Sequence, residues 1–360
     1  MTESTEPTPP EAPRAPDAPA RAPDGPSRPA TAALPLSYTA IIAVLLVVAA
    51  IGSGLAIGTI TRPRPTPVVV APTPTVVPTP TPQPTTNPAV FQQKFSGGCS
   101  TDQAIWVVTD GGGLIRYDGR DWVQVDSTLR TLVRASCDQF ILYAVGPVGA
   151  VLIVDDRARS IDAFDVTIDH LVGVQALPAG AVVAGQSGTI LLLNGGTWQP
   201  YAAGIEEDLN AVILFSPVSG WTVGAGGVSY RLEAAGWRLV TTGTTQTLRG
   251  LAATDPANVV AVGDAGTVAH FDDHWTLIPS AVDVALRDVI VAPDLWIVGD
   301  AGTVLTSDAG GLRRVDVGTK CDLKAVFSRA GDIWMIGSLG GNGGALRLRA
   351  GAVAERWGAC

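Results

Sequence analysis

The chain has 360 residues, enough for one large domain or two of ordinary size. It carries 24 basic and 33 acidic side chains, a formal net charge of −9, and we expect no nucleic-acid partner. Residues 1–90 contain 20 of the 27 prolines and equal numbers of acidic and basic side chains. All nine tryptophans and all four cysteines follow residue 90, so the sequence predicts a long tail joined to a globular part.

The tail contains one apolar segment. Residues 1–37 are rich in proline and alanine and have few large apolar side chains, so we expect them to be disordered. Residues 38–60 are 23 residues without a charge, which as a helix cross a hydrocarbon core of ~30 Å. This stretch is longer than the apolar part of a signal peptide, and it predicts a retained single transmembrane helix. Ala50, Gly54 and Gly58 form a stripe that could weakly pair two such helices, although small residues are common in membrane helices in general.

Residues 61–90 form a Pro/Thr-rich linker of the kind found in cell-surface proteins. Arginines lie on both sides of the apolar segment and do not fix its orientation. The linker and the even number of cysteines in residues 91–360 favour an extracytoplasmic globular domain. We therefore expect a single-pass protein of the cell membrane with a cytoplasmic N-terminus.

Residues 91–360 consist of short apolar runs separated by turn residues, the pattern of an all-β domain. The heptapeptide VGDAGTV occurs at Val262–Val268 and again at Val298–Val304. We expect a tight turn between two strands, with glycines that adopt positive φ. Related motifs recur every 36 to 39 residues and give seven copies, at Thr109, Gly146, Gly185, Gly224, Gly263, Gly299 and Gly337.

A unit of this length cannot bury both of its faces alone, and radial stacking of four-stranded units produces a β-propeller. The sequence therefore predicts a seven-bladed propeller with strands A to D in each blade. Strand A has the pattern Leu-x-small-apolar, and Phe91–Gly98 is the candidate in the first blade. The ring would then close without a shared strand, which predicts a relatively weak junction between the first and last blades. Tryptophans at fixed phases of the repeat indicate packing between sheets rather than a binding platform.

The four cysteines allow three pairings. Cys99 and Cys137 occupy equivalent A–B connections of blades 1 and 2, and Cys321 and Cys360 lie near equivalent ends of strand D. Only the pairs Cys99–Cys137 and Cys321–Cys360 avoid crossing the disc, since bridged Cα atoms lie within ~7 Å of each other. Four free buried thiols are the alternative.

The repeats at residues 255–275 and 292–311 resemble bacterial propeller repeats related to the photosystem II assembly/stability factor family and to BNR (Asp-box) repeats. The segment Thr306–Gly311 (TSDAGG) is similar to an Asp-box without its usual tryptophan. In such proteins the box is a structural turn, so the resemblance implies a fold and not a chemistry.

Chemical motifs are sparse. A phosphate-binding glycine loop would precede a helix, whereas a strand follows each motif here. The spacing of the three histidines, His170, His270 and His274, does not suggest a metal site, and most carboxylates fall in rim turns. We therefore expect no catalytic residues, metal or cofactor. One group departs from the pattern, because the second position of strand A is polar or cationic in four consecutive blades, at Asn210, Arg249, Arg287 and Lys324.

These four residues could line the channel and bind a carboxylate or an acidic segment. Alternatively, the cations pair with neighbours such as Asp288 and Asp322. We expect a non-enzymatic scaffold that binds a protein or glycan partner on one propeller face. A cell-surface glycan-processing hydrolase or lyase is the alternative, and a single-pass sensor is the third reading.

Overall fold

The computed structural model describes residues 88–360 except 128, 129 and 203. The tail, the apolar segment at 38–60 and most of the linker lie outside the described residues, and the expectations for them stay predictions. Within the described part, no helix combines the length and apolar character needed to cross a membrane.

The described part is all-β, and its helical elements are five short 3-10 turns. These are η1 (Pro88–Gln92), η2 (Gln186–Gly188), η3 (Ala225–Gly227), η4 (Asp264–Gly266) and η5 (Asp300–Gly302). The strands of blades 1 to 4 are β1 (Phe95–Ser100), β2 (Ile105–Thr109), β3 (Gly113–Tyr117), β4 (Trp122–Ser127), β5 (Arg134–Cys137), β6 (Ile141–Val145), β7 (Ala150–Asp155), β8 (Ser160–Asp165), β9 (Leu171–Leu177), β10 (Gly180–Gly185), β11 (Ile190–Asn194), β12 (Thr197–Pro200), β13 (Leu209–Ser216), β14 (Ser219–Gly224), β15 (Ser229–Glu233) and β16 (Gly236–Leu239). Those of blades 5 to 7 are β17 (Leu248–Asp255), β18 (Asn258–Gly263), β19 (Val268–Asp272), β20 (His274–Leu277), β21 (Leu286–Val291), β22 (Leu295–Gly299), β23 (Val304–Asp308), β24 (Gly311–Arg314), β25 (Asp322–Arg329), β26 (Asp332–Leu339), β27 (Asn342–Arg349) and β28 (Ala352–Gly358).

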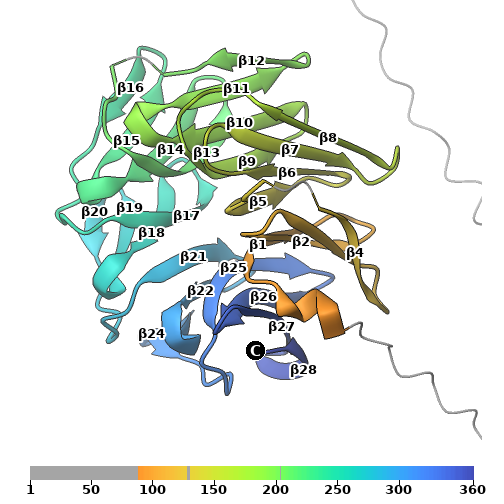
Figure 1. The fold of residues 1–360 in the computed structure, drawn as a ribbon. Helices are drawn as coiled ribbons and strands as arrows, with labels where there is room; N and C mark the ends of the chain where they lie inside the picture. Colours follow the sequence, from red (N-terminus) through yellow and green to blue (C-terminus); the bar gives the residue numbers. More distant parts are fainter. Residues whose placement is uncertain (1–87, 128–129, 203) are drawn as a thin grey trace, which may run out of the picture. The chain divides into compact units, whose positions relative to one another are not determined.

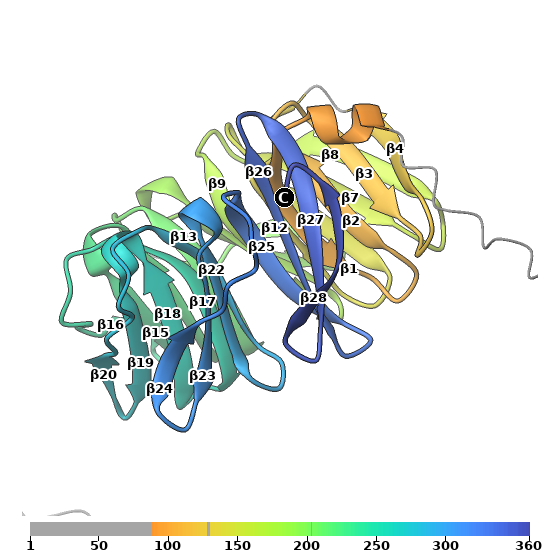
Figure 2. The ribbon, with the colours of Figure 1, turned by 90° about the horizontal axis from the view of Figure 1, so that it is seen from below.

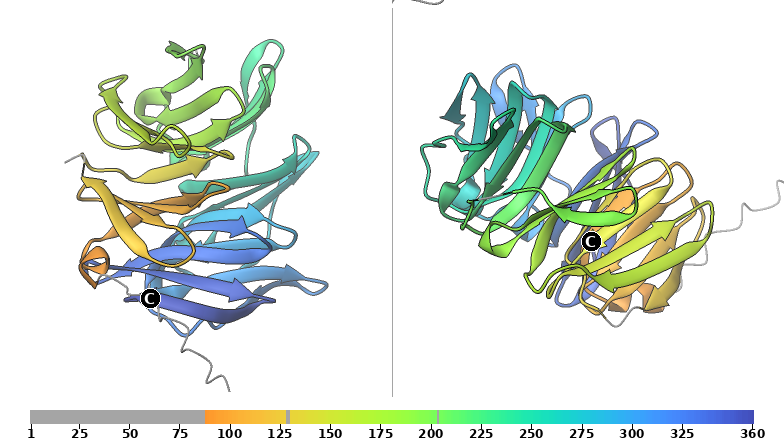
Figure 3. Two further views of the ribbon diagram at one scale, coloured as in Figure 1. Left: turned by 90° about the vertical axis from the view of Figure 1, so that its right-hand side faces the viewer. Right: turned by 90° about the horizontal axis from the view of Figure 1, so that it is seen from above.

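Each blade is a four-stranded antiparallel sheet made of consecutive strands, which confirms the predicted seven-bladed propeller. Figure 1 shows the blades in sequence around a ring, with strand A of each blade innermost. Figure 2 and Figure 3 show the twist of each sheet and the stacking of adjacent sheets. Because the strands run up and down, B–C turns and D–A loops share one face, here called the B–C face. The A–B and C–D turns form the opposite face, here called the A–B face.

The VGDAGTV motif forms the B–C turn, as predicted, but its two positions require glycine for different reasons. Gly266 adopts φ 66°, in the left-handed region that glycine tolerates. Gly263 is extended, with φ −165°, and a Cβ there would lie 2.1 Å from the carbonyl oxygen of Thr247. The prediction of positive φ is therefore wrong for the first glycine. Glycine is needed there because the backbone just before strand A of the same blade leaves no room for a side chain. Between them Ala265 also has positive φ, 51°.

The cores lie between adjacent sheets, and the tryptophans fill them as predicted. The largest aromatic group contains Tyr117, Trp122, Trp334 and Trp357 at the junction of blades 1 and 7. Of the nine tryptophans, seven are buried, namely Trp106, Trp122, Trp221, Trp275, Trp296, Trp334 and Trp357. Buried rings at a fixed phase of the repeat contribute packing rather than an exposed binding surface.

The ring closes without a shared strand, and side-chain contacts join the first and last blades. The first strand A is Phe95–Ser100 and not Phe91–Gly98, because the preceding residues form η1 beside β27 and β28. The hydroxyl of Ser338 on blade 7 donates to the Phe95 carbonyl (2.8 Å). The rings of Trp122 and Trp357, on blades 1 and 7, lie 5.8 Å apart. The expectation of a weak junction concerns stability and stays a prediction, while aromatic packing joins these two blades in place of a shared strand.

Both predicted disulfides are present. Cys99–Cys137 joins β1 to β5, and Cys321–Cys360 joins the residue before β25 to the residue two positions after β28. Each bridge links sites 38 or 39 residues apart, one repeat length. Cys99 and Cys137 lie within strand A rather than in the A–B connections where the sequence placed them. The described residues contain no free cysteine.

Candidate binding site

The predicted cationic residues meet at the channel mouth on the B–C face. Asn210, Arg249, Arg287 and Lys324 line one axial cavity of about 210 Å³. The cavity is formed by the second position of the strand A sequence pattern from all seven blades, together with Arg134. The full lining is Ser96, Val133, Arg134, Val172, Asn210, Arg249, Arg287 and Lys324. The structure therefore brings together the four residues that the repeat phase singled out.

These cations are ion-paired, and two of the partners are the aspartates of the VGDAGTV motifs. Arg249 donates from Nε and Nη2 to the two carboxylate oxygens of Asp264 (2.5 and 2.7 Å). Arg287 contacts Asp300 with the same two nitrogens, and its Nε lies 2.9 Å from Oδ1. Lys324 Nζ lies 3.0 Å from the same Asp300 oxygen. The motif thus supplies acceptors for strand A, which the sequence did not reveal.

The two carboxylates named from the sequence have different roles. Asp322 lies 3.7 Å from Lys324, as expected. Asp288 was expected to pair with a cation of this group, and that prediction is wrong because it pairs with Arg134. Strand A carries Asp288 one residue beyond Arg287, at the small position of the repeat, deeper along the channel.

The pairing around Asp300 changes the proton affinities of the groups. Burial alone would raise the pKa of Asp300, but the hydrogen bonds from Arg287 and Lys324 outweigh it and hold the pKa below its usual value. The hydrogen bond to Asp300 also raises the pKa of Arg287. Both groups are therefore charged at neutral pH.

Arg134 spans the channel and was not singled out from the sequence. Its Nη1 donates to Asp288 on blade 6 (2.9 Å). Its Nη2 donates to the carbonyls of Arg249 and Arg287, both at 3.2 Å. The sequence contained a signal for this pair. The third position of the strand A pattern is glycine or alanine in five blades and is charged in the other two, at Arg134 and Asp288. Two opposite charges at otherwise small positions indicate a pair across the axis.

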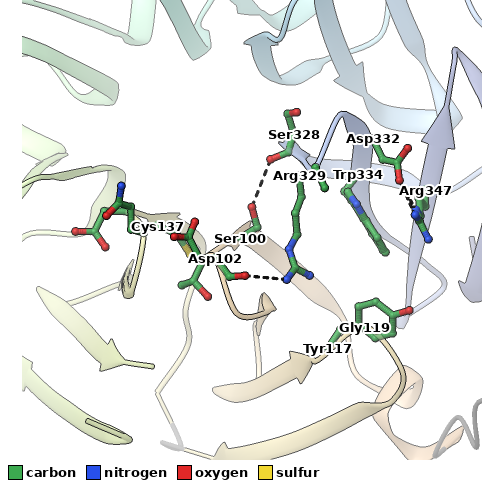
Figure 4. A pocket seen from close by; sticks show the side chains of 14 residues that line it. Ser100, Asp102, Tyr117, Gly119, Cys137, Ser328, Arg329, Asp332, Trp334 and Arg347 are labelled. Atoms are coloured by element: carbon green, nitrogen blue, oxygen red, sulfur yellow. Dashed lines mark hydrogen bonds and ion pairs between the residues drawn. The ribbon is translucent and has the colours of Figure 1, made fainter. Parts of the chain in front are cut away.

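A groove of about 700 Å³ lies on the A–B face between blades 7 and 1, with Cys137, Asp138 and Gln139 of blade 2 along one side. We call it the 7–1 groove, and Figure 4 shows its side chains. Its size is in the range of ordinary ligand sites, roughly 300–1,000 Å³. The lining residues are Ser100, Thr101, Asp102, Tyr117, Gly119, Cys137, Asp138, Gln139, Ser328, Arg329, Ala330, Asp332, Trp334 and Arg347.

Arg329, the last residue of β25, extends into this groove (Figure 4). Its Nη2 donates to the Asp102 carbonyl at 3.2 Å. Burial lowers the pKa of the Arg329 guanidinium because water is partly removed from it. Within the described residues no carboxylate lies at ion-pair distance from Arg329, whereas neighbouring Arg347 contacts both Asp332 and Glu355. Arg329 thus keeps unused donors in a partly desolvated site.

The groove was not predictable from the repeat because its residues come from strand ends and from A–B and C–D turns outside the repeated pattern. Arg329 follows the conserved-looking strand A pattern by several positions and belongs to no repeated phase. The groove exists only because blades 7 and 1, far apart in the chain, meet when the ring closes. Ser100 on blade 1 and Ser328 on blade 7 lie within hydrogen-bond reach there, the Ser100 hydroxyl being 3.4 Å from the Ser328 carbonyl.

The histidines do not form part of either cavity. His270 on β19 is half-buried and contacts the side chain of Asn258 at 2.8 Å. In the part of the chain that the structure describes, no group of three or more His, Cys, Asp or Glu side chains is arranged to hold a metal ion.

Comparison with known proteins identifies a fold. No protein-family model matches the chain, and no curated protein matches it. The WD40 β-propeller domain of Doa1 has a TM-score of 0.61 and 15% identity, covering 71% of this chain and 93% of that chain. YCF48 from Cyanidioschyzon merolae has a TM-score of 0.57 and 13% identity, covering 70% and 94%. A structure of YCF48 bound to D1 peptide has a TM-score of 0.57 and 16% identity, covering 70% and 93%.

At these identities the likeness concerns the fold alone. The resemblance to Asp-box repeats stays a prediction. Residues 88–360 form a β-propeller similar in fold to WD40 domains and to YCF48, a photosystem II assembly factor.

Proposed function

We propose that the propeller is a non-enzymatic binding module that captures an extended segment of a partner protein in the 7–1 groove. The observation that carries this proposal is the partly buried guanidinium of Arg329, which lines the groove without a carboxylate partner among the described residues. A carboxylate of the partner would complete an ion pair in a partly desolvated place. Charge-assisted hydrogen bonds of this kind are stronger than neutral ones.

The rest of the lining favours a peptide over a bare anion. Asp102, Asp138 and Asp332 also line the groove, so an isolated anion would meet repulsion beside Arg329. An extended peptide offers main-chain N–H donors as well as carboxylates and carbonyl acceptors. Two of the lining residues, Tyr117 and Trp334, are aromatic, but they are mostly buried and add only a small apolar part to the lining. A segment with an acidic side chain or a C-terminal carboxylate matches this mixed surface.

A similar fold supports a peptide-binding role. One structure with this fold is YCF48 bound to D1 peptide, which shows that a propeller of this architecture can hold a peptide. We extend that class of ligand, but not its identity, to this chain.

We further propose that the module is anchored in the cell membrane and faces the extracytoplasmic side. The uncharged segment 38–60 and the Pro/Thr-rich linker support an anchor with a spacer. The two disulfides support an oxidising compartment, where such bonds persist. In this arrangement the propeller presents the groove to a partner outside the cytoplasm.

A peptide-display selection tests the binding role. The intact chain is used to select from a library of random linear peptides, and the enriched peptides are measured against wild type and Arg329→Gln. We expect enrichment of acidic peptides and a loss of affinity of about tenfold or more in Arg329→Gln, because one charge-assisted hydrogen-bonded contact is removed. Arg314→Gln is the control, since Arg314 is an exposed arginine on the outer strand of blade 6. Equal affinity of wild type and Arg329→Gln would exclude the groove as the site.

A further inference from the structure

The axial cavity on the B–C face contains a set of hydrogen-bond donors with unused capacity. Asp264 occupies Nε and Nη2 of Arg249, and Asp300 occupies the same two nitrogens of Arg287. In both side chains Nη1 has no hydrogen-bond partner among the described residues. Lys324 Nζ has three donor hydrogens, and its neighbouring acceptors are Asp300 and the more distant Asp322.

The aspartates hold these donors but do not form the cavity surface. Eight residues line the cavity, and four of them are cationic. Among the described residues, no acidic side chain lines it. The carboxylates therefore fix the orientation of the guanidinium groups without lining the cavity themselves. Side chains held in this way lose little conformational freedom when they bind, which favours affinity.

The donors are accessible and the space is small. The exposed fractions of the side chains of Arg249, Arg287 and Lys324 are 33%, 28% and 20%. The volume of about 210 Å³ lies below the range of drug-sized ligand sites, roughly 300–1,000 Å³. It is about seven times the ~30 Å³ that a water molecule occupies in the liquid. A phosphate group or a small di- or tricarboxylate fits this size.

The local charge selects for multivalent ions. Four cations (Arg134, Arg249, Arg287 and Lys324) are accompanied by four carboxylates (Asp264, Asp288, Asp300 and Asp322). Because the charges of this cluster cancel, a monovalent ion gains little binding free energy there. An ion with several oxygens can accept from several donors at once, and its gain is the sum of those contacts.

We propose that the axial cavity is a binding site for a small multivalent oxyanion, held by Nη1 of Arg249, Nη1 of Arg287 and Nζ of Lys324. Asn210 lines the same wall and spends one amide hydrogen on the Leu248 carbonyl (2.8 Å), so its second hydrogen serves the ion. Arg134 closes the channel beneath. This site is independent of the 7–1 groove, which lies on the other face, and does not rest on the proposed peptide binding.

Calorimetric titration of the intact chain with inorganic phosphate, with citrate and with chloride tests this site. We expect phosphate or citrate, or both, to bind with a dissociation constant below about 1 mM, and chloride not to compete at equal concentration. Binding of phosphate alone would assign a phosphate-bearing ligand, and binding of citrate alone a polycarboxylate. No heat of binding from either ion up to that concentration would overturn the proposal.

Two opposite substitutions distinguish a binding site from a structural ion pair. Arg249→Gln removes a donor and should weaken binding about tenfold. Asp264→Asn keeps an oxygen that accepts a hydrogen bond from Arg249 but removes its charge, and it should tighten binding several-fold because less negative charge opposes the ion. Arg238→Gln is the matched control, because Arg238 forms an exposed pair with Glu233 on the outer strand of blade 4.

Folding of each variant is checked by its unfolding temperature in the absence of ligand. If Arg249→Gln does not fold, Asp264→Asn and Lys324→Gln provide the same contrast. Equal affinities in wild type, Asp264→Asn and a folded variant that lacks a cation would overturn the proposal.

Discussion

Arg134 on blade 2 reaches across the axis of the propeller and donates a hydrogen bond of 2.9 Å to Asp288 on blade 6. The same carboxylate accepts from the main-chain N–H of Val326 on blade 7 (2.9 Å). One ion pair therefore links three blades that share no strand. It stabilises the ring across the channel, in addition to the packing between neighbouring blades.

This relationship predicts strong coupling between the two residues. Arg134→Met leaves the Asp288 carboxylate partly buried without its cation and should cost about 2 kcal/mol of unfolding free energy. Asp288→Asn should cost a similar amount, and the double variant should cost clearly less than the sum. Urea unfolding of the four proteins measures the coupling. Strictly additive losses would show that the pair does not join the blades energetically.

The disulfides should stabilise the folded protein mainly by restricting the conformations of the unfolded chain. Each closes a loop of about 38 residues, and the chain-entropy relation gives about 4 kcal/mol for that length. The variant Cys99→Ser with Cys137→Ser should therefore unfold at a markedly lower urea concentration than wild type. Reductant should lower the midpoint of wild type and have a smaller effect on the variant. Identical midpoints for oxidised and reduced wild type would contradict this account.

The first glycine of the B–C turn should not tolerate alanine. In Gly263→Ala the new Cβ would lie 2.1 Å from the Thr247 carbonyl oxygen, so the backbone must shift. Overpacking of this kind costs about 1–3 kcal/mol. Gly111→Ala is the control, because the nearest atom to its Cβ is 4.0 Å away. Thermal unfolding compares the two, and a Gly263→Ala protein as stable as Gly111→Ala would show that the close approach is not limiting.

Acid should weaken the channel ion pairs. The folded pKa of Asp300 lies below its ordinary 3.8, owing to Arg287 and Lys324 against the opposing effect of burial. The stability that it contributes is therefore fully present above the unfolded pKa and is lost as the pH falls through the folded pKa. Asp300→Asn should be less stable than wild type near neutral pH, and the difference should shrink on acidification. Urea unfolding between about pH 6 and pH 3 measures this, and a constant difference would contradict the assignment.

The fold was predictable because the repeat carries its own evidence. The glycine motif, the strand A pattern and the tryptophans recur at one spacing, and each recurrence fixes the same turn or packing position. The ring of Asn210, Arg249, Arg287 and Lys324 was predictable for the same reason, since equal phase in a propeller means equal depth in the channel.

Features outside the repeat were not predictable in this way. Arg134 lies at the third position of the strand A sequence pattern, where no repeated residue suggests a partner, and its partner across the axis depends on the geometry of ring closure. Arg329 is the last residue of β25, beyond the repeated strand A pattern, and its groove forms only where blade 7 meets blade 1. The sequence predicted the position of the VGDAGTV aspartate in the turn. Its contact with strand A was not predictable, because that contact depends on the direction of the aspartate side chain.

The most direct test of the central claim is site-specific photo-crosslinking from the 7–1 groove in the cells that produce the protein. A photoreactive side chain replaces Ser328, which lines the groove, or Leu277, which is exposed on the outer strand of blade 5. We predict that the probe at position 328 yields a discrete adduct with one partner protein, that Arg329→Gln abolishes it, and that the probe at position 277 yields none. An adduct at position 328 that persists in Arg329→Gln, or a partner captured only from position 277, would contradict binding in the groove.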